Sequence, residues 1–448
     1  MFRAVARIFR TPDLRRKIGF TLLIVAIFRL GSFIPAPFVD FQNVQTCLQA
    51  NSNTSGLYEL VNLFSGGALL QLSIFALGIM PYITASIIVQ LLRVVIPHFD
   101  TLYKEGQAGQ SKLTQYTRYL TIGLGVLQST TLITVARSGA LFGTSSTTTA
   151  CSNLITDDGQ TWYGILLMVI TMTAGTGIIM WMGELVTERG IGNGMSLLIF
   201  TSIAARFPSA LQSIWQSKGF PIFLMTIAVG VVIMCLVVFV EQSQRRIPVQ
   251  YAKRMVGRRT YGGNNTYIPI KVNMAGVVPV IFASSLLYIP ALIAQFNQPK
   301  SGATGKAAVP AGWVTWITDN LTQGSGPYYM ILYFLLIVGF TYFYVAITFN
   351  PEEVADNMKK YGGFIPGIRA GRPTAEYLDY VLTRITLPGS LYLGIIALIP
   401  LIALGLVNAS TNFPFGGTSI LIIVGVGLET VKQIDSQLQQ RHYEGLLR

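Results

Sequence analysis

The segment FPIFLMTIAVGVVIMCLVVFV, at residues 220–240, contains no charged side chain. A membrane-spanning helix needs about 20 consecutive apolar residues, and this segment has that length. The whole 448-residue chain has a similar character, with 51% hydrophobic residues, 11% charged residues and a mean hydropathy of +0.53. A soluble protein carries about 25% charged residues. We therefore predict an all-α polytopic membrane protein.

Ten segments of this kind occur along the chain. They cover residues 18–37, 69–92, 119–137, 161–182, 194–212, 220–240, 274–296, 328–349, 387–407 and 415–431. A basic stretch precedes the first segment, as in a signal peptide, but nine further spans follow it. We therefore expect a retained first helix and ten transmembrane helices in all.

The positions of Lys and Arg predict the orientation. If the N-terminus lies inside, the inner segments hold 26 of the 32 Lys and Arg residues of a chain with net charge +13. Cytoplasmic loops carry such an excess, so we expect both termini in the cytoplasm. Any inner-membrane protein shows this bias, and the bias alone identifies no partner.

Two inner segments, residues 241–272 and 350–386, are too long and too patterned to be simple turns. The first holds six basic residues within fifteen positions: Arg245, Arg246, Lys253, Arg254, Arg258 and Arg259. A projecting basic loop suits an acidic partner, either nucleic acid or anionic lipid. Ribosomal RNA, bound through its phosphates, is one candidate.

The spans lack the groups that active transport or catalysis would need. No Asp or Glu lies well inside a span, whereas proton- and sodium-coupled transporters usually carry ionisable groups there. Arg29 is the one charge inside a span, and we expect it to snorkel or to pair in a structural role. No Walker, HExxH or GxSxG motif occurs. We expect neither enzymatic activity nor a metal or cofactor.

The three cysteines are too few for a disulfide scaffold or a Cys-rich metal site. Cys47 and Cys151 both fall in outer segments, but their spacing does not fix the distance between them, so we do not expect them to pair. We interpret Cys235 as an inert apolar residue of the sixth span.

A short apolar segment at residues 57–67 lies between the first two spans. Its apolar positions follow helical spacing, and Gly66 and Gly67 end it. A helix this short is marginal alone and has to pack against something. It is either a re-entrant half-helix that fills a central cavity or a helix lying on the outer surface.

Uncharged polar residues also occur in or beside the spans, at Thr84, Gln90 and Asn273. Hydrogen bonds between helices, worth about 0.6 kcal/mol each, account for them most simply. A seam that opens between helices is the alternative.

The halves 1–217 and 218–448 are candidates for inverted repeats. Glycine-containing turns precede the second, fifth, seventh and tenth spans, and five spans per half reverse the orientation of the second half.

Seven segments of the sequence resemble the bacterial type of the SecY family of protein-conducting channels. They are SGGAL (65–69), ALGIMPYITAS (76–86), TERGIGNG (187–194), KVNMAGVVP (271–279), FNPEEVADN (349–357), FIPGIR (364–369) and FGGTS (415–419). They follow the family order across nearly the whole chain. The resemblance implies a ten-helix hourglass in the bacterial cytoplasmic membrane, which passes unfolded preproteins outward or releases apolar segments sideways into lipid.

The resemblance also implies roles for individual residues. A ring of aliphatic side chains closes the waist of the hourglass: Ile79, Ile83, Met195, Ile199, Ile281 and Ile422. Segment 57–67 corresponds to the plug beneath the ring, with Leu57, Leu60, Val61, Asn62, Phe64, Ser65, Gly66 and Gly67. The second, third, seventh and eighth spans form a lateral gate, with Thr84, Gln90 and Asn273 at its polar seam. Without the resemblance, ordinary core packing would account for the six ring residues.

The partners expected from the resemblance are SecE-like and SecG-like small subunits, the SecA ATPase, the ribosome, and signal sequences of preproteins. The two inner loops would bind SecA or the ribosome, and Arg369 matches the position most closely tied to SecA. A positive-inside role for Arg369 is the simpler alternative. A secondary transporter is the second functional class, since it shares inverted repeats and broken helices. The lack of acids within the spans favours the channel.

Overall fold

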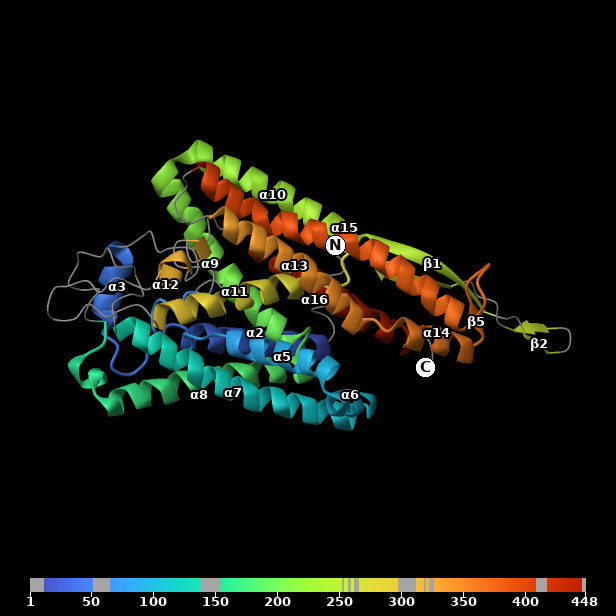
Figure 1. Ribbon diagram of the computed structural model, residues 1–448, viewed down its shortest axis with the longest axis horizontal. Coiled ribbons are helices and arrows are strands. Elements are labelled where there is room, and N and C mark those ends of the chain that lie inside the picture. Colours follow the sequence, from blue (N-terminus) through green and yellow to red (C-terminus); the bar gives the residue numbers. More distant parts are fainter. Residues whose placement is uncertain are drawn as a thin grey trace.

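The computed structural model describes residues 12–50, 65–137, 154–251, 254–256, 259–261, 266–296, 312–317, 320–321, 326–407 and 417–444. Its helices run along the length of an elongated molecule (Figure 1). The helices are α2 (Pro12–Gly31), α3 (Phe41–Ala50), α5 (Met80–Val95), α6 (Pro97–Lys104), α7 (Gln107–Arg137), α8 (Trp162–Arg189), α9 (Gly194–Lys218), α10 (Phe220–Gln242), α11 (Val278–Phe296), α12 (Gly312–Ile317), α13 (Pro327–Thr348), α14 (Pro351–Lys360), α15 (Arg372–Val407) and α16 (Gly417–Glu444), with one 3-10 turn, η3 (Asp157–Gln160). The strands are β1 (Gln244–Tyr251), β2 (Arg254–Val256), β3 (Arg259–Tyr261), β4 (Thr266–Lys271) and β5 (Gly363–Phe364).

Within these ranges, a helix lies at each of the ten predicted spans: α2, α5, α7, α8, α9, α10, α11, α13, α15 and α16. Six helices of the described chain are long and apolar enough to cross a membrane, or seven if the bent pair α5–α6 counts as one span. The prediction of an α-helical membrane protein is therefore confirmed.

Several predicted boundaries are wrong. The second span begins at Met80 rather than at residue 69, because residues 65–79 form consecutive turns. Gly66, Gly67 and Gly78 have positive φ angles there, which breaks a continuous helix. At the other limit, α7, α15 and α16 extend well beyond their apolar segments into polar sequence.

The two halves share most of their helix–helix contacts. In the first half α2 packs on α9, α5 on α7, α7 on α8, and α8 on α9. In the second half α10 packs on α16, α11 on α13, α13 on α15, and α15 on α16. These are the same pairs when the first to fifth spans of one half are matched to those of the other, as an inverted repeat requires. The halves meet where α9 contacts α10 and α16 and where α11 contacts α5 and α7.

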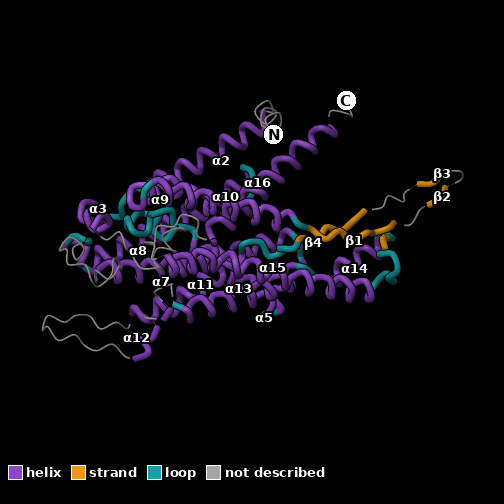
Figure 2. Tube along the Cα trace, turned by 90° about the horizontal axis from the view of Figure 1, so that it is seen from above, coloured by secondary structure: helices purple, strands orange, loops and turns teal. Residues whose placement is uncertain are grey.

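The two long basic loops fold together, which the sequence did not predict. Strand β1 pairs antiparallel with β4 of its own loop and with β5 of the other, in the order β4-β1-β5. Along β1, Ile247 and Val249 are buried while the residues between and around them are exposed, as alternation in a strand requires. The hairpin β2–β3 projects beyond this sheet (Figure 2). We call this part of the molecule the sheet end.

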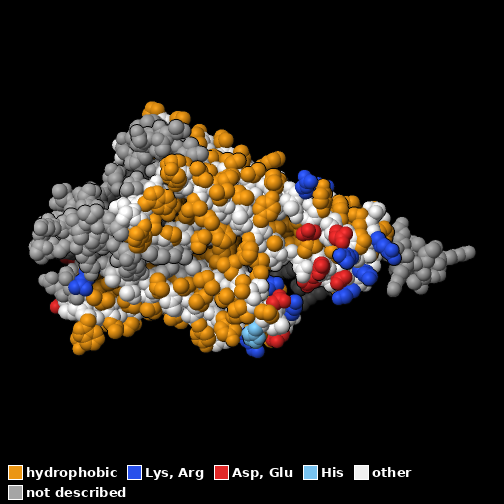
Figure 3. Space-filling view, viewed as in Figure 1, with side chains coloured by type: hydrophobic (Ala, Val, Ile, Leu, Met, Phe, Trp, Pro, Cys, Tyr) orange, Lys and Arg blue, Asp and Glu red, His pale blue; other side chains and the backbone are white. Residues whose placement is uncertain are grey.

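The surface divides into an apolar belt and a charged end. Figure 3 shows hydrophobic side chains over the helices and most of the visible charged ones around the sheet end. Exposed aromatic residues lie near the opposite end of the bundle, among them Trp162, Trp215, Trp313 and Tyr328. Aromatic residues gather at membrane–water interfaces, so this distribution fits a bundle that crosses a bilayer.

The cysteines differ from our expectation in one respect. Cys47 on α3 is fully buried and disulfide-bonded. Cys235 on α10 is a free, exposed thiol. Cys151 lies outside the described residues. The expectation of no disulfide is therefore wrong for Cys47, because folding brings together positions whose separation the sequence does not reveal.

Candidate functional site

All six aliphatic residues assigned to the waist meet in one hydrophobic cluster. Ile79, Met195, Ile199, Ile281 and Ile422 are buried in it, and Ile83 packs against it. They come from four places in the chain: the start of α5, the start of α9, the start of α11 and the start of α16. Their exposed fractions are 9% or less for the five buried residues. The arrangement gives an apolar, water-excluding centre where the two halves meet.

Local sequence fixes where α9 begins and so places two of these residues. Asn193 caps the helix, its side-chain oxygen accepting a hydrogen bond from the Met195 N–H at 3.1 Å. Gly192 has a φ of +83°, which turns the chain back from α8. Thr187 Oγ1 accepts from the Gly194 N–H at 2.9 Å and closes the turn. Met195 and Ile199 then lie one helical turn apart on the same face.

Gly183 on α8 is a contributor to this centre that sequence reasoning missed. A Cβ atom added there would overlap the sulfur of Met195. The glycine therefore provides the space that the longer, more flexible methionine occupies. The one signal in the sequence is a glycine directly after the predicted fourth span, and this signal is weak because glycine is common in transmembrane helices.

Arg29 bonds to the glycine turn that ends segment 57–67. Its Nη1 donates to the carbonyl oxygen of Gly66 at 2.8 Å, and its guanidinium lies 4.7 Å from the centre of the Phe33 ring. Of the two expectations for Arg29, snorkelling or pairing, the structure shows a hydrogen bond to backbone and a contact with an aromatic ring. Of the plug residues, Ser65 is buried and its Oγ accepts from the Leu69 N–H at 3.0 Å. Leu57, Leu60, Val61, Asn62 and Phe64 lie outside the described residues.

The three polar residues assigned to a gate seam make other bonds. Thr84 Oγ1 donates to the Met80 carbonyl within its own helix at 2.9 Å, and Gln90 is exposed. Asn273 is buried, and its Nδ2 donates to Glu241 Oε1 at the end of α10 at 2.6 Å. The structure therefore does not join these three side chains in one network. The expectation of hydrogen bonds between helices is wrong for Thr84, which bonds within α5, whereas Asn273 does bond to another helix, α10.

A groove of about 480 Å³ lies between the α5–α6 elbow and α13. Its lining is Arg93, Val94, Pro97, Asp100, Phe343, Ala346 and Ile347. Helix α6 turns away from α5 by 102°. There the hydrogen bond from the Lys104 ammonium, with the charges of Lys104 and Arg93, lowers the pKa of Asp100. The groove joins the second and eighth spans, and its wall is apolar on the α13 side.

The predicted docking residues gather at the sheet end where the structure describes them. Arg245 and Arg246 are exposed on β1, and the Arg246 guanidinium lies 4.8 Å from the centre of the Tyr267 ring on β4. Arg369 is exposed in the loop that follows β5. Arg254 and Arg259 lie on β2 and β3. Lys253 and Arg258 lie outside the described residues.

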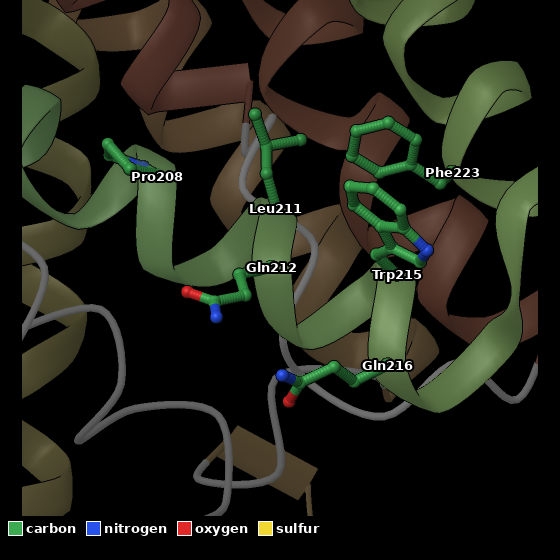
Figure 4. Close-up of a pocket in the computed structure, with 6 residues that line it drawn as sticks. All are labelled: Pro208, Leu211, Gln212, Trp215, Gln216 and Phe223. Carbon is green, nitrogen blue, oxygen red and sulfur yellow. The ribbon is translucent and has the colours of Figure 1, made fainter.

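A second cavity, also of about 480 Å³, lies where α9 turns into α10 (Figure 4). The ring centres of Trp215 and Phe223 are 5.4 Å apart at one wall, and Pro208 and Leu211 line another. None of its lining residues belongs to the hydrophobic centre. Among the described residues, no group of three His, Cys, Asp or Glu side chains is placed to hold a metal ion.

A model of the SecY family matches residues 73–431, most of the chain. The chain belongs to the SecY family. It is similar to the protein translocase subunits SecY of Streptomyces scabiei and Streptomyces coelicolor, each 65% identical over the full length of both chains. The SecY of Mycobacterium bovis is 58% identical, also over both full lengths.

Solved structures share the fold at low sequence identity. One reported as the structure of a protein conducting channel matches with a TM-score of 0.60 and 19% identity, over 93% of this chain and 91% of that one. The Sec61 channel in a canine ribosome complex matches with a TM-score of 0.58 and 18% identity, over the same shares. The ten-helix SecY fold with two inverted halves is thus confirmed. The chain is a multi-pass channel subunit of a protein translocase, and this family is not one of enzymes.

Proposed function

We propose that this chain conducts unfolded preproteins through its hydrophobic centre and releases apolar segments sideways into lipid, driven by SecA or by a translating ribosome. The observation that carries the proposal is the convergence of six aliphatic side chains from both halves at one point. The halves then correspond to residues 1–217 and 218–448.

An aliphatic ring suits this task for a physical reason. A narrow apolar constriction expels water, and ions do not cross it without their hydration shells. The side chains are held only by packing, so a passing polypeptide displaces them without breaking hydrogen bonds. Met195, which occupies the space at Gly183, is the most deformable member of the ring.

The plug and the gate complete the proposal. The bond from Arg29 to the Gly66 carbonyl ties the end of segment 57–67 to α2, which supports a plug held beside the waist. Helix α11 contacts α5 and α7, and the groove at the α5–α6 elbow reaches α13. These four helices are the ones expected to part at a lateral gate. We keep Gln90 and Thr84 as candidate seam residues on α5.

The sheet end is the proposed docking face. Exposed Arg245, Arg246 and Arg369 lie on two loops that share one sheet, so a partner meets them together. SecA and ribosomal RNA are the proposed partners there, and a ribosome complex is described for the canine Sec61 relative. SecE-like and SecG-like subunits are proposed from the family.

We place the sheet end in the cytoplasm of a bacterial cell, with both termini on that side and the membrane being the cytoplasmic one. The excess of Lys and Arg in the loops of the sheet end supports this orientation. The disulfide at Cys47 also supports it, because disulfides persist outside the cytoplasm and α3 lies at the end opposite the sheet (Figure 1).

Reconstitution tests the proposal. The purified chain, with SecE-like and SecG-like subunits, is placed in vesicles together with SecA, ATP and a secretory precursor. We expect the precursor to become protease-protected inside the vesicles, and to remain accessible without ATP. Solute uptake without protection of the precursor would favour the secondary transporter and contradict the channel.

A further inference from the structure

We propose that Glu241 is a positioning residue that holds the beginning of α11 in the closed position through Asn273. The inference rests on the proposed role of Ile281, on α11, in the waist. Glu241 is the penultimate residue of α10 and is partly buried. Burial raises the pKa of the Glu241 carboxyl, and the hydrogen bond from Asn273 and the charges of Lys271 and Lys432 offset this only in part.

A single amide nitrogen connects α10 to the turn that starts α11. Asn273 Nδ2 donates to Glu241 Oε1 at 2.6 Å and to the carbonyl oxygen of Gly276 at 3.2 Å. Gly276 has a φ of +60°, so the turn is tight, and α11 begins at Val278. Asn273 is 3% exposed, and its Oδ1 is buried without a hydrogen-bond partner among the described residues. In the part of the chain that the structure describes, the bond to Glu241 is thus the one side-chain hydrogen bond that joins Asn273 to another helix.

The backbone beside Glu241 and Asn273 is also held in place. A displacement of Asn273 is therefore passed on to α11 rather than taken up by the backbone. The Val272 N–H donates to the Ser243 carbonyl at 3.1 Å, and Gln244 pairs with Lys271 at the end of the β1–β4 ladder. On the other side, a Cβ at Gly389 of α15 would lie 2.5 Å from the Val272 carbonyl oxygen. The segment therefore lies between α10 and α15 with little freedom.

Ile281 is the fourth residue of α11, so a change at Asn273 moves it directly. The sheet that carries the basic loops ends at the same place, because Lys271 is the last residue of β4. A partner that pulls on the sheet therefore acts on the Glu241–Asn273 pair before it acts on the waist. The Glu241–Asn273 pair would then control opening of the waist although neither residue belongs to the ring.

The test exchanges donor and acceptor. Asn273→Asp places two carboxylates against each other and removes the bond, whereas Glu241→Gln keeps an acceptor. In the double variant, the amide introduced at position 241 donates to the carboxylate introduced at position 273 and restores the bond. Hydrogen exchange of peptides covering residues 271–281 is measured in the reconstituted complex, together with resting ion conductance.

We expect Asn273→Asp to speed hydrogen exchange of these peptides about tenfold, because losing a hydrogen bond to a charged group changes an opening equilibrium by about that factor or more. Conductance should rise in the same variant, and both values should return toward wild type in the double variant. Unchanged exchange in Asn273→Asp would overturn the proposal, as would faster exchange throughout the protein, which indicates general unfolding.

Ile281→Ser separates the two claims. If it leaks while Asn273→Asp exchanges faster and does not leak, the pair does not set the position of the waist, and this inference is overturned. If neither variant leaks, the proposed role of Ile281 itself is contradicted.

Discussion

The centre of the molecule consists of side chains with no chemistry beyond size and shape. Ile199 and Ile281 are 5% and 6% exposed, and both are members of one apolar cluster. Packing a protein core and closing a channel require the same types of side chain. A test at the residue scale therefore has to distinguish a residue that closes the channel from one that only packs.

Serine substitutions in the ring make that separation. We expect Ile199→Ser with Ile281→Ser to raise resting ion conductance in planar bilayers, because hydroxyl groups hold water in the constriction. Ile203, 1% exposed in the same cluster and one turn along α9, is the matched control. Ile203→Ser should lower the melting temperature without a leak. Equal conductance in the wild type, the double serine variant and Ile203→Ser would show that the six ring residues are ordinary core residues.

Gly66 is the second residue-scale case. Its φ is +69°, and an added Cβ would lie 3.2 Å from the backbone of Ser202 and 3.3 Å from Arg29 Nη1. Left-handed backbone costs a residue with a Cβ about 1–2 kcal/mol. We therefore expect Gly66→Ala to destabilise the protein by about that amount, read from thermal unfolding in detergent.

Gly19 on α2 is the control for that experiment. It is exposed, helical and has no atom within 4 Å of an added Cβ. Gly19→Ala should stabilise the helix by up to about 1 kcal/mol. A loss of stability at Gly19 as large as at Gly66 would contradict the account of Gly66.

At the scale of elements, the sheet is the feature that turns two loops into one surface. β1 pairs with residues more than a hundred positions away, Gln250 with Phe364 and Tyr251 with Gly363. The motif FNPEEVADN starts α14, the helix that precedes β5. Asn350 caps this helix and Pro351 is its first residue. Arg369 then follows β5 on the exposed side.

We expect Arg369→Glu to abolish SecA-driven import of a precursor into vesicles, while insertion and thermal stability stay at wild-type values. Arg372→Glu is the control, because Arg372 is 90% exposed by its side chain and pairs with Glu376 one turn along α15. A functional loss of equal size in both variants would reduce Arg369 to a general positive-inside residue. Normal import with Arg369→Glu would remove its assigned role.

The elements also show what sequence predicts and what it does not. Residues 220–240 become α10 because only an internally hydrogen-bonded helix satisfies its backbone in lipid. The same reasoning overstated the span at 69–92, because it weighed apolar side chains and not the positive φ angles of Leu72 and Gly78 within it. The partner of Asn273 was not predictable, since Glu241 becomes its neighbour only when β1 pairs with β4 and Ser243 bonds to Val272.

At the scale of the whole molecule, the convergence of the ring is the result that composition alone could not give. Residues 79 and 83, 195 and 199 are helical pairs, and this much follows from spacing. That α5, α9, α11 and α16 bring their first two turns to one point depends on the helix contacts that the two halves share. The resemblance to a known family supplied that information, and the fold agrees with it.

One measurement tests the central claim most directly. A photoreactive amino acid is placed at Ile281, and a secretory chain is arrested during SecA-driven translocation in vesicles. The account predicts a crosslink between the two that requires ATP and is lost when the signal sequence is removed. An engaged, protease-protected chain that gives no crosslink from Ile281 would show that the substrate does not pass the hydrophobic centre.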